Sequence, residues 1–279
     1  MCIGFTILAL LLRAPRVSAD PPTIASVSQE ISSADPAQLQ QAIADIRTLL
    51  DAPVPATAVT YLQAYWFKPI MDAGRFDDAA DLALRGELAT PWNTVMVEGL
   101  QRERVQALIK AGRAQEALAA AKGLFNVSSM ETTDKAVLTL AEALNAARPN
   151  DPGAVDRFKD EQVAGATTRP AEASTAHPGE VMASIHVDPA PYAAALDKYD
   201  PGHYLIRANE YQTMAARGNL LLLVDRGHEA REIFQEMAKT AHDNVERIAA
   251  NAGIARSIKA ESGCIGPADR WVLSLRERP

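Results

Sequence analysis

The sequence predicts an all-α protein built from stacked antiparallel helical hairpins and interrupted by a linker. Helix start and stop signals recur from residue 35 onward, and no run alternates apolar and polar residues as a half-buried strand would. One join between helices also recurs, because "MDAGRFDDAADLA" at 71–83 returns thirty-eight positions later as "IKAGRAQEALAAA" at 109–121. These features together predict a repeated unit of two helices.

Residues 1–19 are expected to be a secretory signal peptide. The apolar run "CIGFTILALLL" at 2–12 is too short to span a bilayer, and Val17 and Ala19 give the small-residue pattern before a cut at Asp20. No Lys or Arg precedes the apolar run, so a buried or dispensable N-terminal helix is the alternative. We expect an exported protein, periplasmic or secreted, with no integral membrane span in its mature form.

Composition excludes several classes of function. Of the 279 residues, 48% are hydrophobic and 23% are charged, which fits neither a disordered tail nor a membrane bundle. The formal net charge of −7 argues against a nucleic-acid partner, since a phosphate backbone requires a basic face. Removal of Cys2 with the signal peptide would leave Cys264 alone, so neither an intramolecular disulfide nor a multiple-cysteine metal site is expected.

Local signals place the helices along the chain. Asp35 and Pro36 form an N-cap and a first helical residue, and glycine after a helix accepts the left-handed backbone of a C-cap. Pro69 is expected to kink or shorten its helix. The expected helices are 36–50, 57–73, 76–85, 91–111, 114–124, 129–148, 152–163, 189–199, 201–226, 229–240, 243–262 and 267–277.

A change in composition divides the chain into two blocks. The stretch "AGATTRPAEASTAHPGE" at 164–180 is rich in Ala, Thr, Pro and Gly and has no apolar period. We therefore expect an N-terminal helical-hairpin block over 20–163, a flexible linker or insertion over 164–188, and a C-terminal helical-hairpin block over 189–279.

The recurring join is expected to be the elbow of each hairpin. Its glycine would allow a left-handed C-cap, and an alanine five positions later would let the second helix approach the first. Gly263 with Ala268 repeats the pattern, Asn150 lies thirty-eight positions after Gly112, and Gly227 gives a looser match. The expected elbows are Gly74, Gly112, Asn150, Gly227 and Gly263.

The segments "AGRFDDA" and "AGRAQEA" resemble the second half of tetratricopeptide repeats. The period of 36–38 residues exceeds the thirty-four of that family, so the repeats are degenerate. The resemblance implies a curved solenoid whose inner surface, lined by the first helices, holds a protein or peptide partner. The groove-facing residues that it implies are Tyr61, Lys68, Arg102, Gln106, Lys110 and Arg217; the alternative is that these are solvated faces of amphipathic helices.

Motifs for catalysis or cofactor binding are weak. "HEARE" at 228–232 lacks the second histidine of a zinc-protease motif, and no phosphate-binding glycine loop or G-x-S-x-G elbow is present. The "SGCIG" stretch puts the Cys264 thiol near a helix N-terminus, but a repeat elbow already explains its glycines. We therefore single out no catalytic, cofactor-binding or metal-binding residue.

The favoured function is an exported, non-catalytic helical-repeat scaffold that binds a protein or peptide. One alternative is a helical-toroid enzyme acting on a polysaccharide, which would need carboxylates converging in one pocket. Another is a structural component of an envelope assembly, which would present a large exposed apolar patch.

Overall fold

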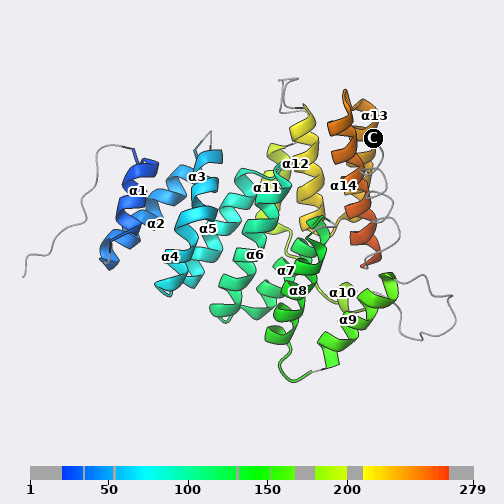
Figure 1. The fold of residues 1–279 in the computed structure, drawn as a ribbon, viewed down its shortest axis with the longest axis horizontal. Helices are drawn as coiled ribbons and strands as arrows, with labels where there is room; N and C mark the ends of the chain where they lie inside the picture. The colour runs from blue at the N-terminus through cyan, green and yellow to red at the C-terminus, as the bar shows by residue number, and fades with distance from the viewer. Residues whose placement is uncertain are drawn as a thin grey trace, which may run out of the picture.

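The computed structural model describes residues 21–33, 35–52, 55–129, 132–151, 153–166, 180–199 and 210–263. All regular structure in these ranges is helical, and consecutive helices pack against one another in an antiparallel manner (Figure 1). The predicted all-α class is confirmed. The expected signal peptide, the middle of the expected linker and the expected helix 267–277 lie outside the described residues.

The helices follow one another along a stack. They are α1 (Ile24–Ile31), α2 (Pro36–Leu50), α3 (Ala56–Tyr61), the π-helical turn η1 (Leu62–Trp66), α4 (Phe67–Asp72), α5 (Phe76–Ala89), α6 (Thr94–Lys110), α7 (Ala114–Val127), α8 (Thr133–Ala147), α9 (Gly153–Ala166), α10 (Glu180–Ala183), α11 (Ala190–Lys198), α12 (Glu210–Leu223), α13 (Gly227–Thr240) and α14 (Asn244–Ser262). Helix α2 has its predicted bounds, whereas α1 was not expected. No helix in the described ranges combines the length and the apolar character needed to cross a bilayer.

Several helix boundaries differ from expectation, among them those of α5, α6 and α8. Helix α5 continues past Gly86, where a Cβ would lie 2.9 Å from the Leu100 side chain, so this glycine serves close packing on α6. Helix α6 begins at residue 94 because the Asn93 side chain accepts the N–H of Met96 at 3.2 Å. Helix α8 begins at Thr133, four residues later than expected.

The second predicted helix remains continuous but changes its pitch. The π turn η1 lies directly before α4, where the N–H of Phe67 bonds the carbonyl of Leu62, five residues back. Pro69 has no N–H to offer the carbonyl of Tyr65 four residues earlier. A wider turn upstream of the proline thus takes the place of a break.

The elbows at Gly74 and Gly112 have one geometry. Gly74 has φ +73°, its N–H donates to the Met71 carbonyl at 3.0 Å, and the N–H of Arg75 donates to the Ile70 carbonyl at 3.1 Å. Gly112 has φ +76° and closes the same two bonds at 3.1 and 2.9 Å. This pair of bonds satisfies carbonyls that the helix end leaves free. The glycine elbow is confirmed at both positions.

The fourth elbow is displaced from the predicted residue. Asp225, not Gly227, takes the left-handed conformation, with φ +63°, and Gly227 is the first residue of α13. With Asp225 as the elbow, Ala230 lies five positions later and is fully buried. The same elbow-to-alanine spacing therefore holds in this unit, and "DRGHEA" at 225–230 aligns with "GRFDDA" at 74–79.

The other two predicted elbows have different outcomes. Gly263 is left-handed, with φ +66°, and follows Asp225 by thirty-eight residues. Asn150 was predicted wrongly, because Asp225 is the one non-glycine residue with positive φ in the described ranges. The C-cap of α8 is instead Arg148, whose φ is −133°, so this helix end has no left-handed residue.

An arginine follows each of the elbows at Gly74, Gly112 and Asp225, and at the first two it connects neighbouring hairpins. Arg75 donates to Gln40 of α2 at 2.5 Å, and Arg113 donates to Asp77 of α5 at 3.0 Å. Each elbow arginine also pairs with an acid three residues onward, as in Arg113 with Glu116. At Gly74 and Gly112 the elbow arginine thus links the next hairpin to the preceding one.

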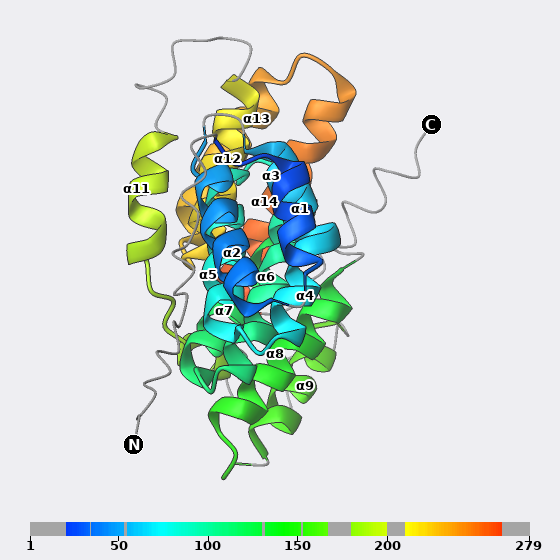
Figure 2. The same cartoon turned by 90° about the vertical axis from the view of Figure 1, so that its left-hand side faces the viewer.

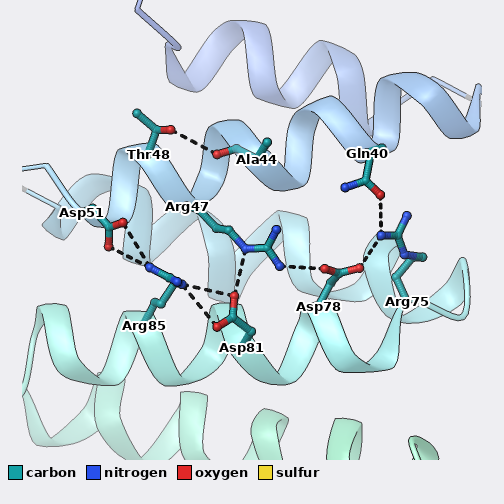
Figure 3. Close-up of polar contacts among 9 residues, drawn as sticks. All are labelled: Gln40, Ala44, Arg47, Thr48, Asp51, Arg75, Asp78, Asp81 and Arg85. Atoms are coloured by element: carbon teal, nitrogen blue, oxygen red, sulfur yellow. Dashed lines mark hydrogen bonds and ion pairs between the residues drawn. The ribbon is translucent and has the colours of Figure 1, made fainter. Parts of the chain in front are cut away.

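The second helices α2 and α5 are joined by a chain of alternating charges (Figure 3). Arg47 donates to Asp78 at 2.7 Å and to Asp81 at 2.9 Å. Arg85 links Asp81 to Asp51, with N–O distances of 3.2 and 3.1 Å. Because these charges form a network and not isolated pairs, they can order the two helices relative to each other.

Helix α7 joins the two predicted blocks, because it packs against α6 and α8 on one side and α12 and α14 on the other. The buried Lys122 ammonium donates to the Asp225 carboxylate and, at 3.0 Å, to the Ile185 carbonyl. Asn126 donates to the Leu222 carbonyl at 3.0 Å. The charge of Asp225 thus explains why an acid stands at this elbow in place of glycine.

Lys259 of α14 completes the junction at the end of α7. Its ammonium is buried and donates to both the carbonyl and the hydroxyl of Ser128 at 2.8 Å. It also lies 4.8 Å from the Phe125 ring centroid. A cation at a helix C-terminus interacts favourably with the carbonyls exposed there.

Gly112→Ala is expected to lower the free energy of unfolding by about 1 kcal/mol, because a φ of +76° strains an L-residue. The loss would come from the backbone alone, since an added Cβ would meet no atom within 4 Å. Gly112→Asn is the matched control and should cost less, since asparagine tolerates this conformation. Urea unfolding followed by circular dichroism measures both. Equal stability of the alanine variant and the wild type would contradict the strain account.

Asp225→Gly is expected to lower the free energy of unfolding by about 1 to 3 kcal/mol, because it leaves the buried Lys122 ammonium without its carboxylate. Adding Lys122→Met removes the unpaired charge and should recover much of the loss. Urea unfolding of the two single variants and the double variant gives their coupling free energy. Losses that simply add would show that the pair does not join the blocks.

Candidate functional site

The candidate site is the exposed surface of the first helices of the hairpins, which we call the first-helix face. First helices are α1, α3–η1–α4, α6, α8, α12 and α14, and second helices are α2, α5, α7, α9 and α13 (Figure 1). On α6, the spacing of Arg102, Gln106 and Lys110 places them on one side of the helix. Gln106 and Lys110 are exposed and Arg102 is half-buried.

The neighbouring first helix contributes an aromatic pair and a lysine. The rings of Tyr61 and Tyr65 lie 5.3 Å apart, and that of Tyr61 lies 5.6 Å from buried Trp66. The Lys68 ammonium is 2.5 Å from the Asp72 carboxylate, and both side chains are exposed. Since η1 packs on α6, this helix adjoins the α6 residues.

Arg217 lies apart from the other predicted residues. It is half-buried in α12, within the second block. The pKa of Glu229 on α13 is lowered mainly because Arg226 hydrogen-bonds to it, and the charge of Arg217 adds to this effect. Five of the six predicted residues therefore occupy two adjoining first helices, and the sixth faces α13.

Exposed large apolar side chains reveal a feature that the sequence patterns did not. In the described part of the chain, every one of them lies on a first helix. They are Tyr65 (64% exposed), Val95 (78%), Leu138 (60%), Val245 (74%) and Ile248 (39%). Exposed apolar surface on a soluble protein commonly marks a contact with another molecule. No periodicity analysis could have found this set, since exposure depends on how the hairpins stack.

Glu103 and Arg102 form an incompletely bonded polar pair on α6. Burial raises the pKa of Glu103 to about 8, and the positive charge of Arg102 opposes this rise. One Glu103 carboxylate oxygen and the Arg102 Nε are buried and have no hydrogen-bond partner among the described residues. Buried polar atoms without partners are costly, so a bound molecule could donate a hydrogen bond to the Glu103 oxygen and accept one from the Arg102 Nε–H.

Metal-ligating residues do not gather in the described ranges: no three His, Cys, Asp or Glu side chains are placed as a metal ion would require. His228 and Glu232 lie 3.8 Å apart, but both side chains are exposed on one helix turn. Cys264 lies outside the described residues.

The chain was compared with protein-family models, with curated proteins and with solved structures, and nothing in the three comparisons matches it. The described residues form an all-α protein whose consecutive helices pack antiparallel.

Arg102→Gln is expected to raise the pKa of Glu103 further, because it removes the one charge that opposes the effect of burial. Carbon-13 NMR of the glutamate carboxyls measures the titration midpoint, which should lie near 8 in the wild type. Lys110→Gln is the control and should leave that midpoint unchanged. A wild-type midpoint at the ordinary value of 4.5 would contradict the burial of this carboxyl.

Proposed function

We propose that the protein is an exported, non-catalytic scaffold of tetratricopeptide-like hairpins that binds a protein or peptide on its first-helix face. The observation that carries the proposal is the confinement of the exposed large apolar side chains of the described residues to first helices. If the exposed large apolar side chains were distributed at random over the surface, some of them would lie on second helices as well.

The repeated elbows support the tetratricopeptide-like part of the proposal. Residues 74–79, 112–117 and 225–230 share an arginine after the left-handed residue and an alanine at the same distance from it. All three alanines are fully buried. The first helices of such hairpins form one continuous surface when the hairpins stack.

The composition of the first-helix face suits a protein or peptide. Tyr65 and Val95 offer apolar contact, while Gln106 and Lys110 offer exposed donors. Aromatic and arginine side chains contribute strongly to protein interfaces. Arg102 adds a guanidinium whose Nε has no partner in the described structure.

Helix α11 of the chain itself contacts the other side of α6. Tyr192 of α11 contacts Arg104, and two residues turn a helix by about 200°, so Arg104 lies on the side of α6 away from Arg102 and Gln106. Export is supported by the apolar run at 2–12 with Val17 and Ala19 after it.

A peptide library displayed on phage and selected on the full exported chain tests the proposal. We expect enrichment of related peptides, and we expect the variant carrying Arg102→Glu and Lys110→Glu to retain less than a tenth of their binding. Lys239→Glu on α13 is the control, since it reverses an exposed charge on a second helix and should leave binding intact.

Two outcomes would overturn the assignment. Selected peptides that bind the double variant as tightly as the wild type would place the surface elsewhere. Failure to enrich any peptide, repeated with a library of folded domains, would contradict a protein-binding role.

A further inference from the structure

A crossing segment, residues 180–199, packs onto the stack from one side; we call it the strap. It comprises α10, α11 and the residues between them. Seen end-on in Figure 2, α11 lies on the side of the stack opposite α1 and α3. Within α11 only Tyr192 and Ala195 are buried, so this helix is held along a single stripe.

Tyr192 docks the strap into a buried polar site between α5 and α6. Its hydroxyl accepts a hydrogen bond from Arg104 Nη1 at 2.8 Å and donates to Glu87 Oε2 at 3.2 Å. Burial raises the pKa of Tyr192, so the phenol keeps the proton that it donates. Arg104 and Glu87 are themselves 3.6 Å apart.

The Glu87 carboxylate is under-bonded in this site. Its side chain is fully buried, and Oε1 has no hydrogen-bond partner among the described residues. An ionised carboxylate needs several donors or close cations to offset the loss of water. Here it has one phenol and one cation beyond hydrogen-bonding distance, so the docked strap favours the protonated acid.

We propose that the strap is a proton-coupled latch, which docks through Tyr192 most firmly when Glu87 carries a proton and loosens when Glu87 is ionised. Undocking takes away the phenol donor but admits water to both carboxylate oxygens, and the water more than replaces that donor and stabilises the ionised form. The coupling is independent of whether the first-helix face binds a partner.

The direction of the pH effect follows from the two states. Burial raises the pKa of docked Glu87 from 4.5 to about 7, although Arg104 and Tyr192 act to lower it. The undocked carboxyl returns toward its ordinary value. Docking is then strongest below about pH 4.5, weakens by about tenfold per pH unit up to about 7, and stays at its weakest above that.

The other charged groups at this site do not reproduce the effect. Burial acts to lower the pKa of Arg104 on α6, but Tyr192 and Glu87 together with smaller effects raise it on balance, so this guanidinium stays charged throughout. Glu116 on α7 contributes to that rise and has a lowered pKa, mainly because Arg113 hydrogen-bonds to it. Glu87 is thus the group whose ionisation is coupled to the strap.

Two further polar contacts of the strap lie away from Glu87. The Lys122 ammonium donates to the Ile185 carbonyl at 3.0 Å, and Arg148 donates to the Ser184 hydroxyl at 3.0 Å. These two bonds anchor the α10 end, and the Tyr199 ring lies 6.1 Å from that of Trp92 at the other end of the strap, so we expect the loosening to centre on Tyr192.

Hydrogen–deuterium exchange of the full chain at pH 5 and pH 8, corrected for the intrinsic exchange rates, tests the latch. Peptides covering 190–199 are expected to lose about tenfold or more of their protection at pH 8, while those from α7 keep theirs. Equal protection of 190–199 at both pH values would overturn the proposal.

Glu87→Gln is the diagnostic variant, since the amide imitates the protonated acid. It is expected to hold the strap at pH 8 as firmly as at pH 5, and a persisting pH dependence would refute the role of Glu87. Tyr192→Phe should lower protection at both pH values and retain the dependence, which keeps the test valid if Glu87→Gln folds poorly. Glu142→Gln on α8 and His186→Asn on the strap are controls that should behave as the wild type.

Discussion

The left-handed residue at Gly74, Gly112 and Asp225 reverses the chain through the same hydrogen-bond pattern each time, and the arrangement of the hairpins depends on it. The reversal sets the direction in which each second helix returns. A fully buried alanine five residues later then allows close approach to the first helix. The arginines after Gly74 and Gly112 also contact the preceding hairpin, in addition to an acid on their own helix.

First and second helices have different structural roles in the stack. Second helices hold the molecule together: α2 and α5 share a network of charges, and α7 is buried between the blocks (Figure 3). The first helices have an outer side that none of these contacts uses. Tyr65 and Val95 are exposed on that side because no neighbouring helix covers them. We propose that partners bind there for the same reason.

Features fixed by neighbouring residues were predictable from the sequence, and those fixed by distant contacts were not. The cap at Asp35 and the glycine elbows are local, so α2 and the turns at Gly74 and Gly112 were predicted correctly. The elbow at Asp225 was missed because its acid is explained by Lys122, 103 residues away. Of the candidate surface, the polar α6 residues were implied by the resemblance to tetratricopeptide repeats, whereas its apolar members and the raised pKa of Glu103 depend on stacking and burial.

Hydroxyl-radical footprinting of the chain, alone and with a bound partner protein or peptide, tests the central claim most directly. The account predicts that binding protects first-helix side chains such as Tyr65 and Leu138, and that half-buried Phe76 and Ile233 on second helices keep their reactivity. Protection confined to second helices or to the strap would contradict it, because the partner would then occupy the surfaces that hold the hairpins together.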